Sequence, residues 1–205
     1  MNSINFEVSL YKIAMSEFQL HFLLGFDHVL DWNGYDHLLF LIVLVSIYEF
    51  TDWKKVVGLV TAFTVGHMAS LIASTFGWVS VSASAVEFLI PVTILATAVY
   101  HLLQTRKDSK ELPVYITYLI TIFFGLIHGL GFANYFRSLD EDATLPLLEF
   151  ALGIEVAQLL IVLIALVVGF IAKNVLKASA RDWTIAVCCI TIGLLVQMLA
   201  DTWPF

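Results

Sequence analysis

Histidine and acidic side chains stand inside the long apolar stretches of this chain, and their types are those that bind metals. A charge near the centre of a bilayer costs a few kcal/mol or more, so such residues usually face the interior of a helix bundle and mark a site or pathway. Imidazole and carboxylate groups together bind divalent transition metals. The predicted metal ligands are His28, Asp36, His37, His67, His128 and Glu155. The residues predicted to line the pathway are Glu87, Ser70 and Gln158.

The stretch HVLDWNGYDHLLF carries the strongest motif, with seven residues between His28 and the pair formed by Asp36 and His37. Asn-Gly is a strong turn signal, so a turn at Gly34 can bring His28 back toward the pair. Asp36 can also cap a helix N-terminus, and His37 can be a hydrogen-bonded packing residue between helices. Both alternatives remain open on the sequence alone.

The next two apolar stretches also carry polar groups at helical spacing. His67, Ser70 and Ser74 recur at i, i+3 and i+7, which predicts one polar stripe along a helix. Glu87 stands one turn before Pro91, which removes a backbone donor and kinks a helix. A carboxylate at that place suits cation binding, proton exchange or a structural hydrogen bond to a neighbouring helix.

Polar residues in the fourth and fifth apolar stretches complete the set. His128 lies between Gly125 and Gly129, a small-xxx-small pattern that leaves room for an ion, a water or a close helix. Glu155 and Gln158 are three residues apart and share one helix face.

Two other polar residues are predicted to lie outside the site. Glu149 precedes Glu155 by six residues and faces another side of the same helix, so we expect it at the membrane interface. His101 stands beside Gln104 and Arg106 at a helix end, which predicts an interface residue rather than a ligand.

Composition places the chain among polytopic membrane proteins. Of 205 residues, 60% are hydrophobic and 13% charged, and the mean hydropathy is +0.91. Soluble domains carry roughly twice that charged fraction. The net charge of −7 and the lack of a basic patch exclude nucleic acid as a partner. Cys188 and Cys189 are adjacent, so they are predicted to pack within a helix without bridging each other.

Six spans of roughly the length that a bilayer requires can be marked along the chain. The predicted fold is an all-α bundle of these spans, residues 34–205, preceded by an N-terminal segment, residues 1–33, that contains an interfacial or re-entrant helix. The first residues contain neither a basic region nor an apolar core, so no signal peptide is expected. The predicted spans are 36–51, 55–77, 84–104, 113–134, 144–172 and 183–203.

Lys and Arg residues sort onto one side of these spans. Eight of the ten lie in or beside the first, third and fifth of the loops that connect the predicted spans, which are called loops one, three and five. The other two are Lys12 and Arg137. The positive-inside rule then places loops one, three and five in the cytoplasm and both termini outside. With about 1.5 Å per helical residue, the predicted ligands all fall in the outer half of the membrane, which favours a common site.

The motifs resemble those of the HupE/UreJ family of bacterial membrane proteins across roughly residues 16–200. The resemblance is carried by Gly25-x2-His28, the stretch from Gly34 to Phe40, Gly66-His67, the stretch from Ile127 to Ala133, and Gly153-Ile154-Glu155 with Gln158. It implies a nickel permease of the bacterial inner membrane that accompanies hydrogenase or urease maturation. It also implies that His28, Asp36, His37 and His128 matter for transport.

The chain departs from the pattern of that family in three respects. Seven residues, rather than five, separate His28 from the Asp-His pair. A cleavable signal peptide and a histidine-rich terminus, both frequent in the family, are not found in this sequence. The chain therefore resembles a divergent branch.

Two functions of different classes fit these residues. The first is a secondary permease for a divalent transition metal, with nickel favoured and the ion as its substrate; few Met and Cys residues argue against Cu(I). The second is an intramembrane metal-dependent enzyme, a hydrolase with bound zinc, acting at the outer leaflet. A purely structural subunit is a third interpretation. The expected partners are membrane lipids and the metal ion.

Overall fold

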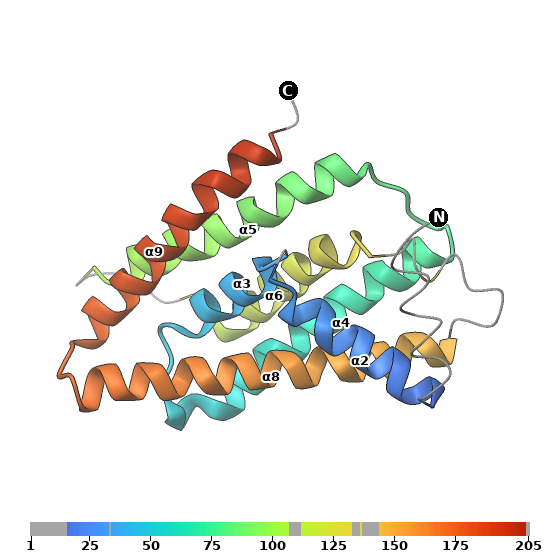
Figure 1. Ribbon diagram of the computed structural model, residues 1–205. Helices are drawn as coiled ribbons and strands as arrows, with labels where there is room; N and C mark the ends of the chain where they lie inside the picture. Colours follow the sequence, from blue (N-terminus) through green and yellow to red (C-terminus); the bar gives the residue numbers. More distant parts are fainter. Residues whose placement is uncertain (1–15, 33, 107–111, 133–135, 137–143, 204–205) are drawn as a thin grey trace.

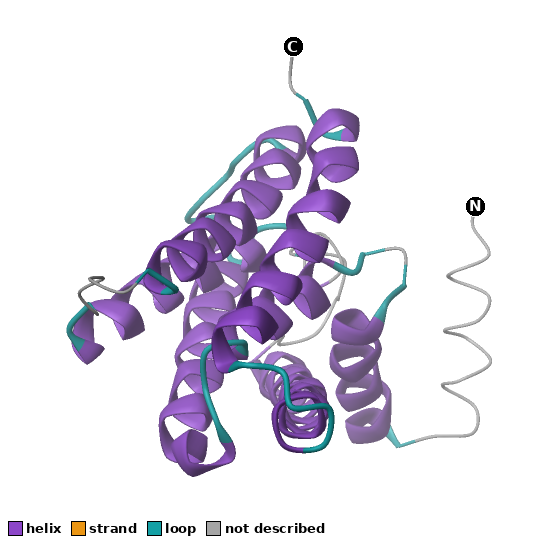
Figure 2. Ribbon diagram, turned by 90° about the vertical axis from the view of Figure 1, so that its left-hand side faces the viewer, coloured by secondary structure: helices purple, strands orange, loops and turns teal. Residues whose placement is uncertain are grey.

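The computed structural model describes residues 16–32, 34–106, 112–132, 136 and 144–203, whose regular secondary structure is entirely helical (Figure 2). In chain order, the helices are α2 (Glu17–Leu30), α3 (Asp36–Val45), the short 3-10 helix η1 (Phe50–Asp52), α4 (Trp53–Thr75), α5 (Ala83–Gln104), α6 (Val114–Gly129), α8 (Thr144–Asn174) and α9 (Ala180–Asp201).

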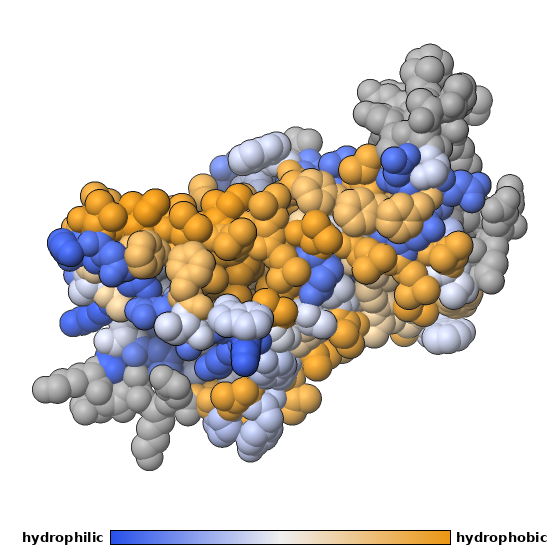
Figure 3. Space-filling view, turned by 90° about the horizontal axis from the view of Figure 1, so that it is seen from below, coloured by the Kyte–Doolittle hydropathy of each residue, from blue (hydrophilic) through white to orange (hydrophobic). Residues whose placement is uncertain are grey.

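Four of the described helices are long and apolar enough to cross a membrane: η1 with α4, α5, α8 and α9. The apolar helices α3 and α6 are shorter. Apolar side chains cover much of the face shown in Figure 3, and hydrophilic residues gather toward its left and right ends. The expectation of an all-helical, multi-pass membrane protein is confirmed at this level.

Two pairs of parallel helices meet through glycines. In the first pair, α2 lies along α8: a Cβ at Gly25 would overlap the carbonyl oxygen of Phe150, and a Cβ at Gly153 would overlap that of Phe22 (Figure 1). In such pairs only glycine lets the two backbones approach this closely. The predicted interfacial position of the N-terminal helix is not confirmed, because α2 packs lengthwise on the longest helix.

The second pair is α4 with α6. A Cβ at Gly66 would overlap the carbonyl oxygen of Ile122, and one at Gly125 would overlap that of Phe63. Gly129 lies equally close to the carbonyl oxygen of His67. The small-xxx-small pattern predicted to be a packing face is thus the contact between these two helices, and it holds α6 against the part of α4 that carries His67.

The helical structure is interrupted between α2 and α3. Helix α2 ends at Leu30, the amide of Gly34 donates to the carbonyl oxygen of Asp31 at 3.2 Å, and α3 begins at Asp36. This agrees with the turn expected at Gly34, while Asn33 lies outside the described residues. Helix α3 then runs through the middle of the molecule (Figure 1), where Phe40 and Leu41 are fully buried.

Candidate metal site

Three histidines from three helices converge where α2 ends. His28 lies in the last turn of α2, His37 in the first turn of α3 and His67 in the second half of α4. One ring nitrogen from each can be chosen so that all three lie within 4.8 Å of one another. The centroid distances between the rings are 4.9 Å for His28 and His37, 5.7 Å for His28 and His67, and 5.5 Å for His37 and His67.

A fourth histidine and a carboxylate border this group. The ring centroid of His128 lies 5.4 Å from that of His37, and Oδ1 of Asp36 lies 3.4 Å from Nδ1 of His37. The N-cap residue of α3 is Tyr35, and Asp36 is the first residue of the helix, so Asp36 does not occupy the capping position. The geometry therefore favours Asp36 as a neighbour of His37 over the capping alternative.

His128 is oriented by its own helix. Its Nδ1 lies 2.8 Å from the carbonyl oxygen of Phe124. A carbonyl oxygen can only accept, so Nδ1 carries the proton and Nε2 keeps its lone pair in the neutral ring. Ligand histidines usually have this second hydrogen bond, which fixes the tautomer and aims the free nitrogen.

Several ring nitrogens at the centre make no hydrogen bond within the described part of the chain. Both nitrogens of His37, both of His67, Nε2 of His28 and Nε2 of His128 are buried without a hydrogen bond there. Each buried polar atom left without a partner costs about 1–3 kcal/mol. Helix packing alone would not gather several such atoms at one point, whereas a divalent ion would satisfy them together.

Binding an ion requires only a small contraction of this group. Metal–nitrogen bonds of about 2.0–2.1 Å in a tetrahedral arrangement place ligand nitrogens roughly 3.3 Å apart, and these nitrogens lie within 4.8 Å of one another. Phenylalanine rings surround the histidines: Phe132 at 4.6 Å from His28 and Phe63 at 5.0 Å from His128, between centroids. Such an apolar shell excludes water and strengthens the interactions of a charge with its ligands.

Glu155 and Gln158 lie in a separate polar layer between α4 and α8. The Thr61 hydroxyl donates to Oε1 of Glu155 at 2.6 Å, and Thr64 contacts Oε2 of Glu155 and, at 2.9 Å, Oε1 of Gln158. Thr64 is three residues before His67 on α4, so this layer adjoins the histidines along one helix face. The structure thus brings four predicted histidines and Asp36 together and places Glu155 one layer away.

The other predicted pathway residues lie apart from the ring nitrogens. The Ser70 hydroxyl donates to the carbonyl oxygen of His67 at 3.0 Å and so is occupied within its own helix. Glu87 is exposed near the start of α5.

Sequence reasoning missed one buried pair, His21 with Glu149. Nδ1 of His21 lies 2.8 Å from Oε2 of Glu149, and both side chains are about one-tenth exposed. Glu149 was expected at the membrane interface, but it is buried in the contact between α2 and α8. The helix periodicity correctly placed Glu149 and Glu155 on different faces of α8. The sequence did contain a pattern that indicates this pair. Each of the two residues lies four positions before a glycine of the helix contact, His21 before Gly25 and Glu149 before Gly153.

A repeated sequence also escaped notice. Gly25 and His28 on α2 have the same spacing as Gly125 and His128 on α6, and each glycine packs on the carbonyl oxygen of a phenylalanine in a parallel partner helix. The two histidines therefore enter the site from equivalent positions of the two glycine-packed pairs.

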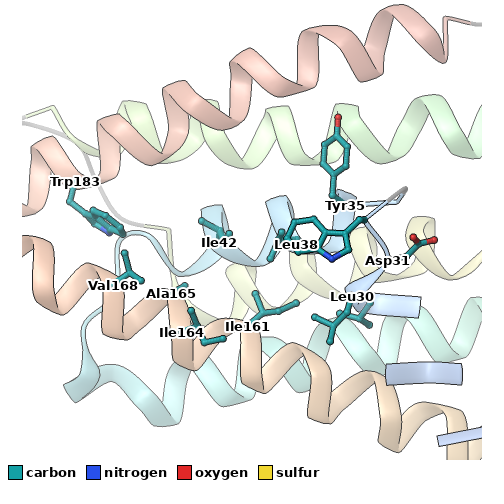
Figure 4. A pocket seen from close by; sticks show the side chains of 12 residues that line it. Leu30, Asp31, Tyr35, Leu38, Ile42, Ile161, Ile164, Ala165, Val168 and Trp183 are labelled. Atoms are coloured by element: carbon teal, nitrogen blue, oxygen red, sulfur yellow. The ribbon is translucent and has the colours of Figure 1, made fainter. Parts of the chain in front are cut away.

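An apolar groove of about 250 Å³ lies beside the site between α3, α8 and α9 (Figure 4). Leu38 and Ile42 of α3, Ile161 and Val168 of α8 and Trp183 of α9 line it. It offers almost no polar atoms to a ligand and so is not a candidate ion site.

Comparison with known proteins gives one match. A family model described as HupE / UreJ protein matches residues 6–204. No curated protein and no solved structure matches the chain.

Proposed function

Since the chain belongs to the HupE/UreJ family, we propose that it is a secondary permease for a divalent transition metal ion, with nickel favoured as the substrate. The family suggests a role in transporting nickel or cobalt, and a histidine cluster of matching chemistry is present. The ion is bound by His28, His37, His67 and His128, with Asp36 as a neighbouring carboxylate.

One observation carries this proposal: buried imidazole nitrogens from α2, α3, α4 and α6 lie close to one another without hydrogen bonds in the described residues. Imidazole suits nickel, cobalt and zinc, whereas soft thiolate and thioether ligands are not found at the described site.

We infer six membrane spans, the first of them discontinuous. Helices α2 and α3 follow each other across the bundle, and their 14 and 10 residues give about 36 Å of helix, enough for a hydrocarbon core of about 30 Å. Helices α4, α5, α6, α8 and α9 form the others. Broken helices near the midplane are typical of the substrate sites of secondary transporters.

The orientation follows from the basic residues. Lys54 and Lys55 lie in the first turn of α4, Arg106 follows α5, and Lys173 and Arg181 flank the loop between α8 and α9. These are all at one end of the bundle (Figure 1), which the positive-inside rule assigns to the cytoplasm of a bacterial inner membrane. Both termini then face the periplasm, and His67 and His128 lie nearer the periplasmic ends of α4 and α6.

The two glycine-packed pairs support a carrier mechanism. Each pair is held together by backbone contact, and His28 belongs to one pair while His67 and His128 belong to the other. A site between two rigid units can open to either side when one unit rocks against the other. Glu155, where the two pairs meet at Thr61 and Thr64, is placed to couple this motion to proton binding.

Nickel uptake by the purified protein in liposomes, together with equilibrium nickel binding, tests the proposal. We expect His37→Ala and His67→Ala to abolish both, while Gln197→Ala, an exposed residue of α9, changes neither. A zinc ion that survives dialysis, with no uptake of any divalent ion, would overturn the permease and point to an intramembrane enzyme instead.

A further inference from the structure

Two adjoining cavities lie between the histidine site and the end of the bundle that carries the basic loops. The inner cavity, of about 190 Å³, is bounded by Phe40 and Leu44 of α3, Thr97 of α5, and Thr121 and Phe124 of α6. The outer cavity, of about 490 Å³, reaches Lys55, Gln104 and Arg181 at the helix ends. Tyr100, His101, Leu112 and Thr117 line both, so the two are neighbours along one line.

The residues that line the outer cavity differ in chemistry from those that line the inner cavity. The outer cavity is bordered by charged and amide side chains. In the inner cavity, the Thr97 hydroxyl donates to the carbonyl oxygen of Thr93 at 2.9 Å and that of Thr121 to Thr117 at 2.8 Å, so both are occupied within their own helices. The inner cavity is therefore largely apolar near Phe40 and Leu44, whereas Tyr100 and His101, which it shares with the outer cavity, are polar.

His101 stands at the boundary between the two cavities. Its side chain is buried, and Nδ1 lies 3.3 Å from the hydroxyl oxygen of Ser46 at the end of α3. The interface position expected for His101 is wrong, because its side chain is buried and also hydrogen-bonds to the backbone of Val43. Imidazole is a common metal ligand, so His101 at the boundary of a polar cavity is placed to contact a divalent cation.

One layer of aromatic rings separates the inner cavity from the histidine site. Phe40 lines the cavity, and its ring centroid lies 5.5 Å from that of His128 and 4.7 Å from that of Phe63. Phe124, whose carbonyl oxygen holds His128, lines the cavity beside it. Moving the Phe40 ring would join the cavity to the site.

Helix α3 has space on two faces. Leu38 and Ile42, one turn apart, border the apolar groove of Figure 4, and Phe40 and Leu44, also one turn apart, border the inner cavity. The helix is short and lies between the turn at Gly34 and the one that follows Val45. A displacement of α3 toward the groove would carry Phe40 away from the cavity.

We propose that these two cavities form the cytoplasmic half of the metal route, with Phe40 as its closing ring and His101 as a second, transient ligand for the divalent cation. This rests on the permease function proposed above. It gives the metal ion an exit to the cytoplasm. The sequence alone does not indicate this exit, because the cytoplasmic halves of the helices are largely apolar.

Cysteine labelling tests the route. In a background with Cys188 and Cys189 replaced by alanine, Thr121→Cys and Thr117→Cys are exposed in liposomes to a small, charged, membrane-impermeant methanethiosulfonate from either side. We expect both to react from the cytoplasmic side, Thr117→Cys faster because Thr117 lines both cavities. In addition, Phe40→Ala should let Thr121→Cys react from the periplasmic side as well, because the Phe40 ring lies between the cavity and the histidine site. Leu119→Cys, on the exposed face of α6, is the control and should not react.

The two proposals fail in different ways. If wild-type protein takes up nickel but Thr121→Cys reacts only from the periplasmic side or not at all, the inner route is wrong and the permease stands. If wild-type protein takes up no divalent ion, the permease itself is wrong. Labelling is read by mass spectrometry, so it gives a result even where a variant transports poorly.

His101 has its own test. We expect His101→Gln, which retains a hydrogen-bonding group near Ser46, to bind nickel at equilibrium as wild type does but to slow uptake about tenfold. Uptake at the wild-type rate in His101→Gln would show that the residue is only structural.

Discussion

Gly25→Ala offers a sharp test of how the bundle positions its histidines. Replacing glycine by alanine inside a helix stabilises it by about 0.5–1 kcal/mol where space allows. At Gly25 the added Cβ would overlap the carbonyl oxygen of Phe150. Backbone cannot turn aside as a flexible side chain can, so α2 and α8 must separate by on the order of 1 Å, at a cost of about 1–3 kcal/mol.

The consequence reaches the metal site through α2. His28 follows Gly25 by three residues on the same helix, so its nitrogen moves with the helix. Supporting changes that displace a ligand typically weaken metal binding by about 10–100-fold. Nickel titration calorimetry on purified Gly25→Ala should give a dissociation constant raised by that factor, together with a lower unfolding temperature.

Gly193→Ala is the matched control. Gly193 lies within α9, and an added Cβ there meets no atom within 4 Å. The variant should gain up to about 1 kcal/mol of stability and bind nickel as wild type does. Wild-type nickel affinity in Gly25→Ala would refute the claim that the contact between α2 and α8 positions His28.

Three further results are expected. Glu149→Gln should lower the free energy of unfolding by about 3 kcal/mol, because it leaves His21 without its buried carboxylate; nickel stoichiometry should stay unchanged, and a lost binding site would contradict this. Nickel affinity should fall as pH falls, because protons compete for the imidazole lone pairs; calorimetry in buffers of different ionisation enthalpy should detect proton release on binding, and its absence would argue against imidazole ligands. Thr64→Val should slow uptake while equilibrium binding holds, since Thr64 contacts Glu155 rather than the ion; an unchanged uptake rate would remove Glu155 from the mechanism.

The lengths of the apolar stretches and the positions of glycines in turns and helix contacts made most of the fold predictable. Hydropathy located α4, α5, α8 and α9 within three residues at each end, because lipid demands long apolar runs. The predicted spans 36–51 and 113–134 extended beyond the ends of α3 and α6, at Val45 and Gly129. The place of α2 could not be read in this way. Its moderate hydropathy suggests an interface, but its position depends on Gly25 and Gly153 fitting each other across more than a hundred residues.

The four histidines of the candidate site could be singled out in the sequence because an imidazole inside a membrane-spanning helix usually has a functional role. The position of Glu155 was less so. Its helix face was correctly paired with Gln158, but whether that face meets the histidines or Thr61 and Thr64 depends on how α4 and α8 cross. Spacing within one helix carries no information on that crossing.

The cavities below Phe40 could not be predicted either. They lie between α3, α5 and α6, and their lining threonines Thr97 and Thr121 donate to carbonyl oxygens of their own helices. In sequence, the same residues look like ordinary positions of an apolar membrane span.

X-ray absorption spectroscopy of the nickel-loaded protein tests the central claim most directly. If His28, His37, His67 and His128 bind the transported ion, the spectrum should show imidazole nitrogens from at least three histidines, and His67→Ala should lose one of them. A spectrum of oxygen ligands alone, unchanged in His67→Ala, would show that nickel binds elsewhere and would contradict the account.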